Sequence, residues 1–484
     1  MIRIMGVSAT LLLIFAVGVT LIQVSSDPFT NQNSQHQTEL EPDTFAFGST
    51  IVGAFQTGRV PDGGSSDIGW VTSTNGGATW SNGFLPGITR YFQGGTYTAV
   101  SDPAVAYDAS HNVWMISSLA ITNSIGKAVL VSRSTDGGIT WGNPVTVNNQ
   151  NGFADKEWIA CDNTSTSPFY GHCYVEWDDA GNGDQVKMST STDGGVTWSK
   201  ANTSSGAFSL GGQPVVQPNG TVVVPIAGVE AFTSTDGGQS WTRPVTVSNS
   251  TDHGVAGGLR TSALPSAEVD GAGKVYVVWQ DCRFRTGCRS NDIVMSTSTD
   301  GRTWSQVTRI PIDPTTSTVD HFIPGIAVDP ATSGNTAHLG LTFYFYPNTS
   351  CNGSTCQLGV GFVSSQDGGQ TWSRPTKVAG PMKLNWLANT TQGRMVGDYI
   401  STSYVNGKPF SVFAVAVAPT GSVFNEAMFA PATGFAGLES AERYSAAADL
   451  PVPNAKSDHP PRQFYDQEGI LPIPPGAKVP PERD

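Results

Sequence analysis

The stretch Ser-Thr-Asp-Gly-Gly-Ile-Thr-Trp at residues 134–141 decides the fold, because close copies of it recur along the 484-residue chain. An apolar β-type run, Ala-Val-Leu-Val, precedes it. Asp-Gly-Gly favours the positive φ angles of a tight turn, and the Asp carboxylate accepts hydrogen bonds from nearby backbone N–H groups. Thr-Trp then begins the next strand. Each copy is predicted to join two antiparallel strands, with its Asp as scaffold and not as a catalytic group.

The stretch occurs six times and marks a repeat architecture in which insertions fall in loops. Two more strands are predicted ahead of each copy, and in the second repeat they are residues 103–107 and 113–116. Each repeat is then a meander of four strands, A to D, with the copy in the C–D turn. Four-stranded meanders repeated around an axis make a β-propeller. The copies are residues 73–80, 134–141, 191–198, 234–241, 298–304 and 365–372.

The repeated stretch resembles the Asp box, or bacterial neuraminidase repeat, Ser-x-Asp-x-Gly-x-Thr-Trp. The resemblance covers residues 45–432 and implies an all-β, sialidase-like β-propeller with four-stranded blades. Three or four further strands are expected after the last copy, within residues 395–429, which predicts seven blades. Six blades, with this segment completing the ring, is the alternative. Many members of the superfamily are sialidases and many are not, so fold and activity are separate inferences.

The composition indicates an extracellular β protein. Only 13% of the residues are charged, 55 are glycine, and the formal net charge is −13. No basic stripe is visible, which excludes a nucleic-acid partner, because such a partner requires clustered Lys and Arg. No metal-ligand spacing and no phosphate-binding loop appears, so no cofactor and no metal are predicted.

The ends of the chain differ in composition from its middle. Residues 1–26 are predicted to be an export signal, because Arg3 precedes a long apolar run. The run is long enough to cross a bilayer, so an uncleaved membrane anchor is the alternative. In both cases the folded part lies outside the cytoplasm. Residues 27–44 are expected to be a linker, residues 45–432 the propeller, and residues 433–484 a tail rich in Pro and Ala.

Six cysteines agree with an exported protein. Six cysteines allow many pairings, but neighbours in this sequence each bracket a loop, and an oxidising compartment favours disulfides over metal binding. Three local disulfides are therefore predicted: Cys161 with Cys173, Cys282 with Cys288, and Cys351 with Cys356.

The order of the strands predicts which face carries function. The A–B and C–D turns share one face of a propeller, and the D–A and B–C loops share the other. Because the repeated turns occupy the first face, a pocket is expected on the opposite face, built from residues just ahead of each strand A. A chain with few charges has gathered many of them at that predicted rim.

The resemblance to sialidases implies the parts of such a pocket. In these enzymes three arginines clamp the sugar carboxylate, an Asp is the general acid or base, and a Tyr paired with a Glu is the nucleophile. The candidates for the clamp are Arg260, Arg394 and either Arg59 or Arg283. The candidate nucleophile is Tyr399, and the other candidates are Asp102, Asp155 and Asp320 as acids, Glu157 or Glu268 as activator of a tyrosine, and Asp398 and His321 as further substrate contacts.

These assignments rest on position, because the Arg-Ile-Pro or Arg-Leu-Pro motif of the family is absent, with Arg59-Val60-Pro61 a loose echo of it, and three arginines do not align with the family pattern. The resemblance favours a secreted glycoside hydrolase that acts on a terminal, acidic sugar, such as an exo-α-sialidase. The alternatives are a non-catalytic propeller that binds glycan or protein, and a polysaccharide lyase. The expected partner is a glycan, and the sequence gives no oligomeric state.

Overall fold

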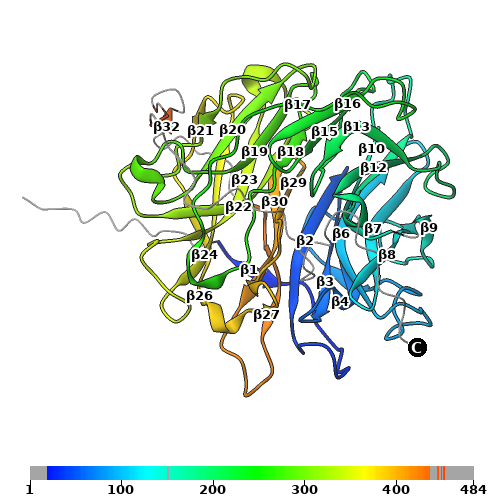
Figure 1. Ribbon diagram of the computed structural model, residues 1–484, viewed down its shortest axis with the longest axis horizontal. Helices are drawn as coiled ribbons and strands as arrows, with labels where there is room; N and C mark the ends of the chain where they lie inside the picture. The colour runs from blue at the N-terminus through cyan, green and yellow to red at the C-terminus, as the bar shows by residue number, and fades with distance from the viewer. Residues whose placement is uncertain (1–18, 150–151, 436–443, 446–448, 450, 453–484) are drawn as a thin grey trace, which may run out of the picture.

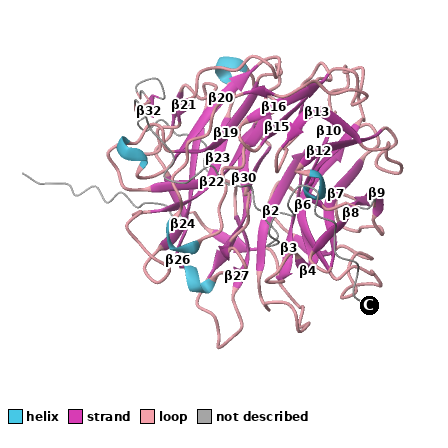
Figure 2. Cartoon of the chain, viewed as in Figure 1, coloured by secondary structure: helices cyan, strands magenta, loops and turns pink. Residues whose placement is uncertain are grey.

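The computed structural model describes residues 19–149, 152–435, 444–445, 449 and 451–452. Within these residues strands make up nearly all of the regular structure, and the helices are single short turns (Figure 2). Those turns are η1 (Ala180–Asn182), η2 (Ala256–Gly258), η3 (Thr286–Cys288), η4 (Gly334–Thr336) and η5 (Leu384–Trp386). The prediction of an all-β chain is confirmed.

The strands pair in sequence order into antiparallel four-stranded meanders. The first two meanders are joined by one register pair, Ser65 with Val100, into an eight-stranded sheet. The strands of the first four meanders are β2 (Glu39–Phe47), β3 (Thr50–Arg59), β4 (Ser65–Ser73) and β5 (Ser81–Phe84); β6 (Ala99–Asp108), β7 (Val113–Thr122), β8 (Ile125–Ser134) and β9 (Val145–Asn148); β10 (Ala154–Cys161), β11 (Cys173–Asp179), β12 (Gln185–Ser191) and β13 (Asn202–Phe208); β14 (Val215–Val216), β15 (Val222–Ile226), β16 (Glu230–Ser234) and β17 (Val245–Thr246).

The later sheets follow the same plan, except that the N-terminal strand β1 is the outer strand of the last sheet, and there are two small additions. Their strands are β18 (Ser266–Val269), β19 (Val275–Asp281), β20 (Asp292–Ser298) and β21 (Thr308–Arg309); β22 (Asp320–Val328), β23 (Leu339–Tyr346), β24 (Gln357–Ser365) and β26 (Thr376–Lys383); β29 (Ser401–Val405), β30 (Lys408–Ala416), β31 (Glu426–Pro431) and β1 (Leu21–Gln23). The additions are two-stranded: β25 (Thr371–Trp372) pairs with β32 (Tyr444–Ser445), and β27 (Ala388–Thr390) pairs with β28 (Gly393–Met395).

The repeated turns have the predicted structure. In the third copy, Asp193 Oδ1 accepts hydrogen bonds from the backbone N–H groups of Val196 and Thr197 at 3.0 and 2.9 Å. Asp193 Oδ2 accepts one from Thr197 Oγ1 at 2.6 Å. Ser191 Oγ donates to Asp193 and accepts from the backbone N–H of Gly195. All the groups that the Asp binds belong to its own turn, which agrees with a scaffold role.

Each turn also fastens its sheet to the sheet before it. Gly138 has a φ of +77°, and a β-carbon there would lie 2.8 Å from a methyl group of Val52 in β3. In the first turn, a β-carbon on Gly77 would lie 2.3 Å from the ring of Phe410 in β30. Only glycine fits such contacts. The first turn therefore packs against the last meander.

The first strands of the meanders lie innermost. Neighbouring inner strands pack against one another from β2 through β6, β10, β14, β18 and β22 to β29, and β29 contacts β2. Figure 1 shows the blue N-terminal sheet beside the orange strands β29 and β30. The apolar core is divided into clusters between adjacent sheets; one of them joins Met115 of β7 to Val175 and Trp177 of β11. Radially repeated meanders around a centre are the arrangement of a β-propeller.

The folded part begins earlier than the sequence analysis placed it. Strand β1 pairs with β31, and the N–H of Val24 donates to the carbonyl of Met428 at 2.9 Å. These residues lie inside the segment that was assigned to the export signal. Strand β2 likewise begins at Glu39, ahead of the expected boundary at residue 45. Residues 1–18, which hold most of the apolar run, lie outside the described residues.

Parts of the expected tail lie against the sheets. Besides the pairing of β32 with β25, Asp449 Oδ2 lies 2.9 Å from Arg309 Nη1. The N–H of Val452 donates to the carbonyl of Arg283 at 2.8 Å. The other residues of the expected tail, 436–443, 446–448, 450 and 453–484, lie outside the described residues. In the part of the chain that is described, no helix is long and apolar enough to cross a membrane.

All three predicted disulfides are confirmed: Cys161–Cys173, Cys282–Cys288 and Cys351–Cys356. The first joins directly opposite residues at the ends of β10 and β11. The other two close the β19–β20 and β23–β24 connections. Three disulfides indicate an extracytoplasmic protein, because cytosolic reductants keep most thiols reduced.

We predict that the N-terminal strand contributes to stability. A chain that begins at residue 27 lacks β1 and the buried side chain of Val24, which is 3% exposed. Burying a valine is worth about 1.5–3 kcal/mol, so thermal unfolding followed by circular dichroism should give a clearly lower Tm than for a chain beginning at residue 19. Equal Tm values for the two chains would contradict the role of β1.

Candidate functional site

A cavity of about 410 Å³ lies at the centre of the ring of inner strands. Residues of β2, β6, β10, β14, β18, β22 and β29 all line it. The exposed residues of its wall, Phe47, Gly271 and Pro330, stand where β2, β18 and β22 end, on the face that carries the repeated turns. The cavity therefore opens on that face. The order of the strands predicts a pocket on the opposite face, so the cavity differs from that prediction.

The opposite end of the cavity is shaped by β-bulges in the inner strands. The register shifts at Glu41, Asp102 and Lys156, and these residues have left-handed φ angles of 59°, 48° and 49°. A bulge redirects the side chains that follow it. Here the bulges bring side chains of three separate strands together near the axis.

The side chains at this end form a buried ion cluster, named here the Lys156 cluster: Lys156, Glu41, Asp102, Asp398 and Arg260. Lys156 Nζ lies 2.7 Å from Asp398 Oδ2, 3.0 Å from Asp102 Oδ1 and 3.5 Å from Glu41 Oε1. Arg260 binds Asp398 through two parallel bonds, Nε to Oδ1 at 2.9 Å and Nη2 to Oδ2 at 2.5 Å. No member is more than 5% exposed. The cluster closes the axis on the side away from the repeated turns.

Lys156, Arg260 and Asp398 hold one another in the charged state, whereas burial raises the pKa of Glu41 to about 8 against the charge of Lys156. Burial lowers the pKa of Lys156, but Asp102, Asp398 and Glu41 together raise it well above its ordinary value. Burial likewise raises the pKa of Asp398, and Arg260 and Lys156 outweigh it, so that this pKa falls below its ordinary range. Such a cluster is costly to break, because removing one ion leaves its partners buried and unpaired.

The arginines proposed as a clamp have separate partners. Arg260 binds Asp398, so a protein carboxylate occupies the position that a clamp would offer to a sugar carboxylate. The backbone N–H of Arg260 does donate to the carbonyl of Arg394 at 2.7 Å, which places these two residues side by side. The other three guanidinium groups also bind protein atoms. Arg394 donates to the carbonyl of Leu387, Arg59 to Gln56 Oε1, and Arg283 to Asp281.

Tyr399 lines the cavity, and its hydroxyl is bound within the protein. Its hydroxyl donates to the carbonyl of Pro103 at 3.0 Å, and its ring meets that of Trp158 edge-on, with centroids 4.9 Å apart. Burial, followed by the charges of Glu41, Asp102 and Glu157, raises its pKa well above the ordinary value. A phenol that attacks a sugar must lose its proton readily, which this surrounding opposes.

Three other carboxyl groups face the cavity: Glu157 from β10, Asp43 from β2 and Glu268 from β18. Glu157 is 1% exposed, and no other residue donates a hydrogen bond to either of its oxygens. Burial, then the charge of Asp102, raises the pKa of Glu157 well above its ordinary value. Burial raises the pKa of Asp43 to about 7, and burial together with Asp43 raises that of Glu268 to about 8.

The remaining predicted residues lie outside the cavity wall. Asp155 is buried at the start of β10 and accepts a bond from the N–H of Lys156. Asp320 Oδ1 accepts bonds from the backbone and the side chain of Asn291, and burial raises its pKa to about 7. His321 is buried, and burial lowers its pKa. Their positions give them no contact with a ligand in the cavity.

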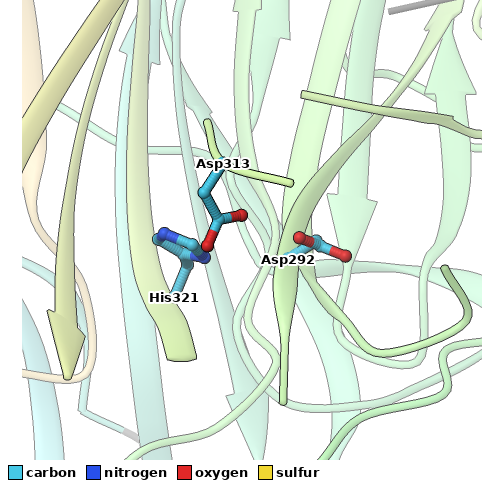
Figure 3. A group of neighbouring side chains, drawn as sticks. All are labelled: Asp292, Asp313 and His321. Atoms are coloured by element: carbon cyan, nitrogen blue, oxygen red, sulfur yellow. The ribbon is translucent and has the colours of Figure 1, made fainter. Parts of the chain in front are cut away.

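His321 also belongs to a group with the residue types of a metal site. Side-chain atoms of Asp292, Asp313 and His321 lie within 4.8 Å of one another, and Asp313 points toward the His321 ring (Figure 3). Two arginines already bind these carboxylates. Arg285 and Arg309 each contact both Asp292 and Asp313 at 2.5–2.9 Å. The arginines supply the positive charge that a cation would bring, so the group is an ion-pair network.

Comparisons with known proteins show structural similarity to solved proteins but assign the chain to no family. No family model matches the chain, and no curated protein matches it. A solved protein of unknown function from Dyadobacter fermentans is 15% identical with a TM-score of 0.46, covering 72% of this chain and 99% of that one. A Hadza microbial sialidase is 16% identical with a TM-score of 0.41, covering 82% and 66%. The α-L-arabinofuranosidase of Podospora anserina is 12% identical with a TM-score of 0.37, covering 74% and 98%. At these values none of them assigns an activity.

We predict that Lys156→Met destabilises the protein by about 3–5 kcal/mol, because three buried carboxylates lose their ammonium partner. The matched control is Lys187→Met. That ammonium lies 4.0 Å from Asp179 at a partly exposed position, where a pair is worth about 0–1 kcal/mol. Urea unfolding measures both losses of stability. Equal losses for the two variants would contradict the proposed contribution of the cluster to the free energy of unfolding.

The free energy of unfolding should fall as pH rises from about 4.5 to about 8. Glu39 and Glu268 have pKa values raised from 4.5 to about 8, chiefly by burial. Over this range the folded state therefore holds protons that the unfolded state has lost, and deprotonation favours unfolding. The lowered pKa of Asp398 adds no slope there, since that group stays ionised in both states.

Urea unfolding at intervals across that range measures the slope, and Glu268→Gln should reduce it by removing one of the groups. A free energy that is constant or rises with pH would contradict the assignment of buried, protonated carboxyl groups.

Proposed function

We propose that the protein is an extracytoplasmic glycoside hydrolase built on a seven-bladed β-propeller, with the central cavity as its active site. Seven inner strands line the cavity, β2 contacts β29, and β1 completes the last sheet by pairing with β31. The packing of Gly77 on Phe410 also supports a ring that closes between the first and last sheets.

The observation that carries the proposal is the state of Glu157. Its carboxyl group is buried, has no hydrogen-bond donor from another residue, and faces a cavity large enough for one or two sugar units. Burial raises the pKa of this group well above its ordinary value and so favours the protonated form. A protonated carboxyl in an apolar surrounding is the usual general acid for the leaving oxygen of a glycoside.

Hydrolysis also needs a second carboxyl group, as carboxylate. Asp43 and Glu268 approach the same cavity from other strands, and the charge of Asp43 adds to burial in raising the pKa of Glu268. Asp43 has the lower pKa of the two, about 7, and accepts a bond from the N–H of Val105 at 2.7 Å. We assign the general acid to Glu157 and the carboxylate to the Asp43–Glu268 pair.

The contacts favour this assignment over an exo-α-sialidase. The four candidate arginines have protein partners, and Tyr399 donates to a backbone carbonyl. A carboxyl-based hydrolase needs neither an arginine clamp nor an ionised tyrosine.

We predict that Glu157→Gln lowers kcat on a responsive aryl glycoside by at least about 100-fold, because the amide cannot deliver a proton to the leaving group. The substrate is found by screening wild-type protein against aryl glycosides of neutral, amino and acidic sugars. Tyr399→Phe should keep kcat within about tenfold of wild type. The matched control is Glu176→Gln, a buried glutamate outside the cavity wall, which should leave kcat unchanged.

Two results would contradict the assignment. A loss with Tyr399→Phe as large as that with Glu157→Gln would favour the tyrosine nucleophile of the sialidases. Absence of turnover by wild-type protein on every glycoside would favour a non-catalytic propeller that binds its partner.

A further inference from the structure

Most of the ionisable side chains in the cavity wall are acidic. Five side chains that line the cavity are acidic, and Lys156 is the one basic side chain among the described residues of the wall. Lys156 is bound to three carboxylates of the cluster, so it offers no free positive charge to a ligand. An anionic sugar would place its carboxylate beside Glu157, Glu268 and Asp43 with nothing to neutralise it.

Two acidic groups of the wall have their hydrogen bonds supplied within the protein. Asp398 is bound by Arg260 and Lys156, and Asp270 accepts bonds from three backbone N–H groups and from the hydroxyl of Tyr276. Glu157 differs from both, because it is buried and unpartnered. An unpartnered buried carboxyl group is costly. A hydrogen-bond donor placed inside the cavity would supply the missing partner.

Aromatic rings stand close to these carboxyl groups. Phe45, Trp158, Tyr399 and Tyr404 line the cavity, and Phe47, 42% exposed, lies at its mouth. Faces of such rings attract cations, and carboxylates beside them add to the attraction. Rings also stack on sugars, so the wall combines features that recognise both a cation and a saccharide.

We propose that the cavity binds a saccharide that carries a protonated amine, such as a glucosamine unit, with the ammonium group donating to Glu157 and Glu268. This inference rests on the proposed function only in taking the ligand to be a sugar. It differs from the acidic sugar that the sequence resemblance suggested. The bound ammonium donates to one oxygen of Glu157, while the other oxygen keeps the proton that a general acid needs. The ammonium also favours the ionised form of Glu268, so binding releases protons.

The test compares two ligands that differ in charge at one position of the sugar: the β-1,4-linked dimer of glucosamine and that of N-acetylglucosamine. Isothermal titration calorimetry of the wild-type protein at mildly acidic pH should give at least about tenfold tighter binding of the amine dimer. Repeating the titration in buffers of different ionisation enthalpy should show proton release. Sialyllactose, an anionic saccharide, should bind more weakly than either.

Variants then locate the effect. Glu157→Gln and Glu268→Gln should each reduce the preference for the amine dimer, whereas Glu176→Gln should keep it. Thermal unfolding verifies that each variant is folded, and the wild-type comparison stands without them. Equal binding of the two dimers, or preferential binding of sialyllactose, would overturn the inference.

The outcome separates this inference from the proposed function. Selective binding of the amine dimer without cleavage of any glycoside would remove the hydrolase proposal and leave the amine site. Cleavage of a neutral glycoside without any preference for an amine would leave the hydrolase and remove the amine site.

Discussion

The ammonium group of Lys156 holds together one end of the central cavity. It lies within 3.5 Å of carboxylates from three different parts of the ring, and Arg260 completes the cluster from a fourth. These groups are separated by up to 357 residues along the chain. Buried charges are stable only when paired, so the cluster requires the sheets to keep their relative positions. The inner strands are fixed around the axis as a consequence.

The same bulge that builds the cluster also builds the cavity wall. Lys156 and Glu157 are consecutive, yet one binds the cluster and the other faces the cavity without a partner. The bulge in β10 makes this possible, because it breaks the regular alternation of side chains. The structural charge and the proposed catalytic carboxyl are therefore placed by one irregularity of the backbone.

The cavity and the gathered charges lie on different faces of the ring, whereas the sequence predicted both on one face. Charged residues do gather on the face away from the repeated turns, but Arg260 and Asp398 satisfy each other there. The open end of the cavity lies on the face that carries the repeated turns, beside the Cys161–Cys173 disulfide. Charges that gather at one rim of the ring can therefore form a buried ion cluster that closes the channel, as well as a binding site. The exposure of the charged side chains distinguishes the two, because a buried ion cluster excludes water.

The sequence by itself determined the repeating unit. The turn at residues 134–141 carries its own hydrogen-bond groups, and alternating strands and close cysteine pairs are equally local, so their structure followed from neighbouring residues. It also indicated Glu157, Tyr399 and Asp398 as inward-facing residues, from their place ahead of strand A. Only the tertiary structure decided which charges neutralise one another, since Lys156 and Asp398 meet across 242 residues. For the same reason the depth of burial of Glu157, the contribution of Asp43 and the pairing of β1 with β31 were not visible in the sequence: each depends on contacts between sheets that no local pattern encodes.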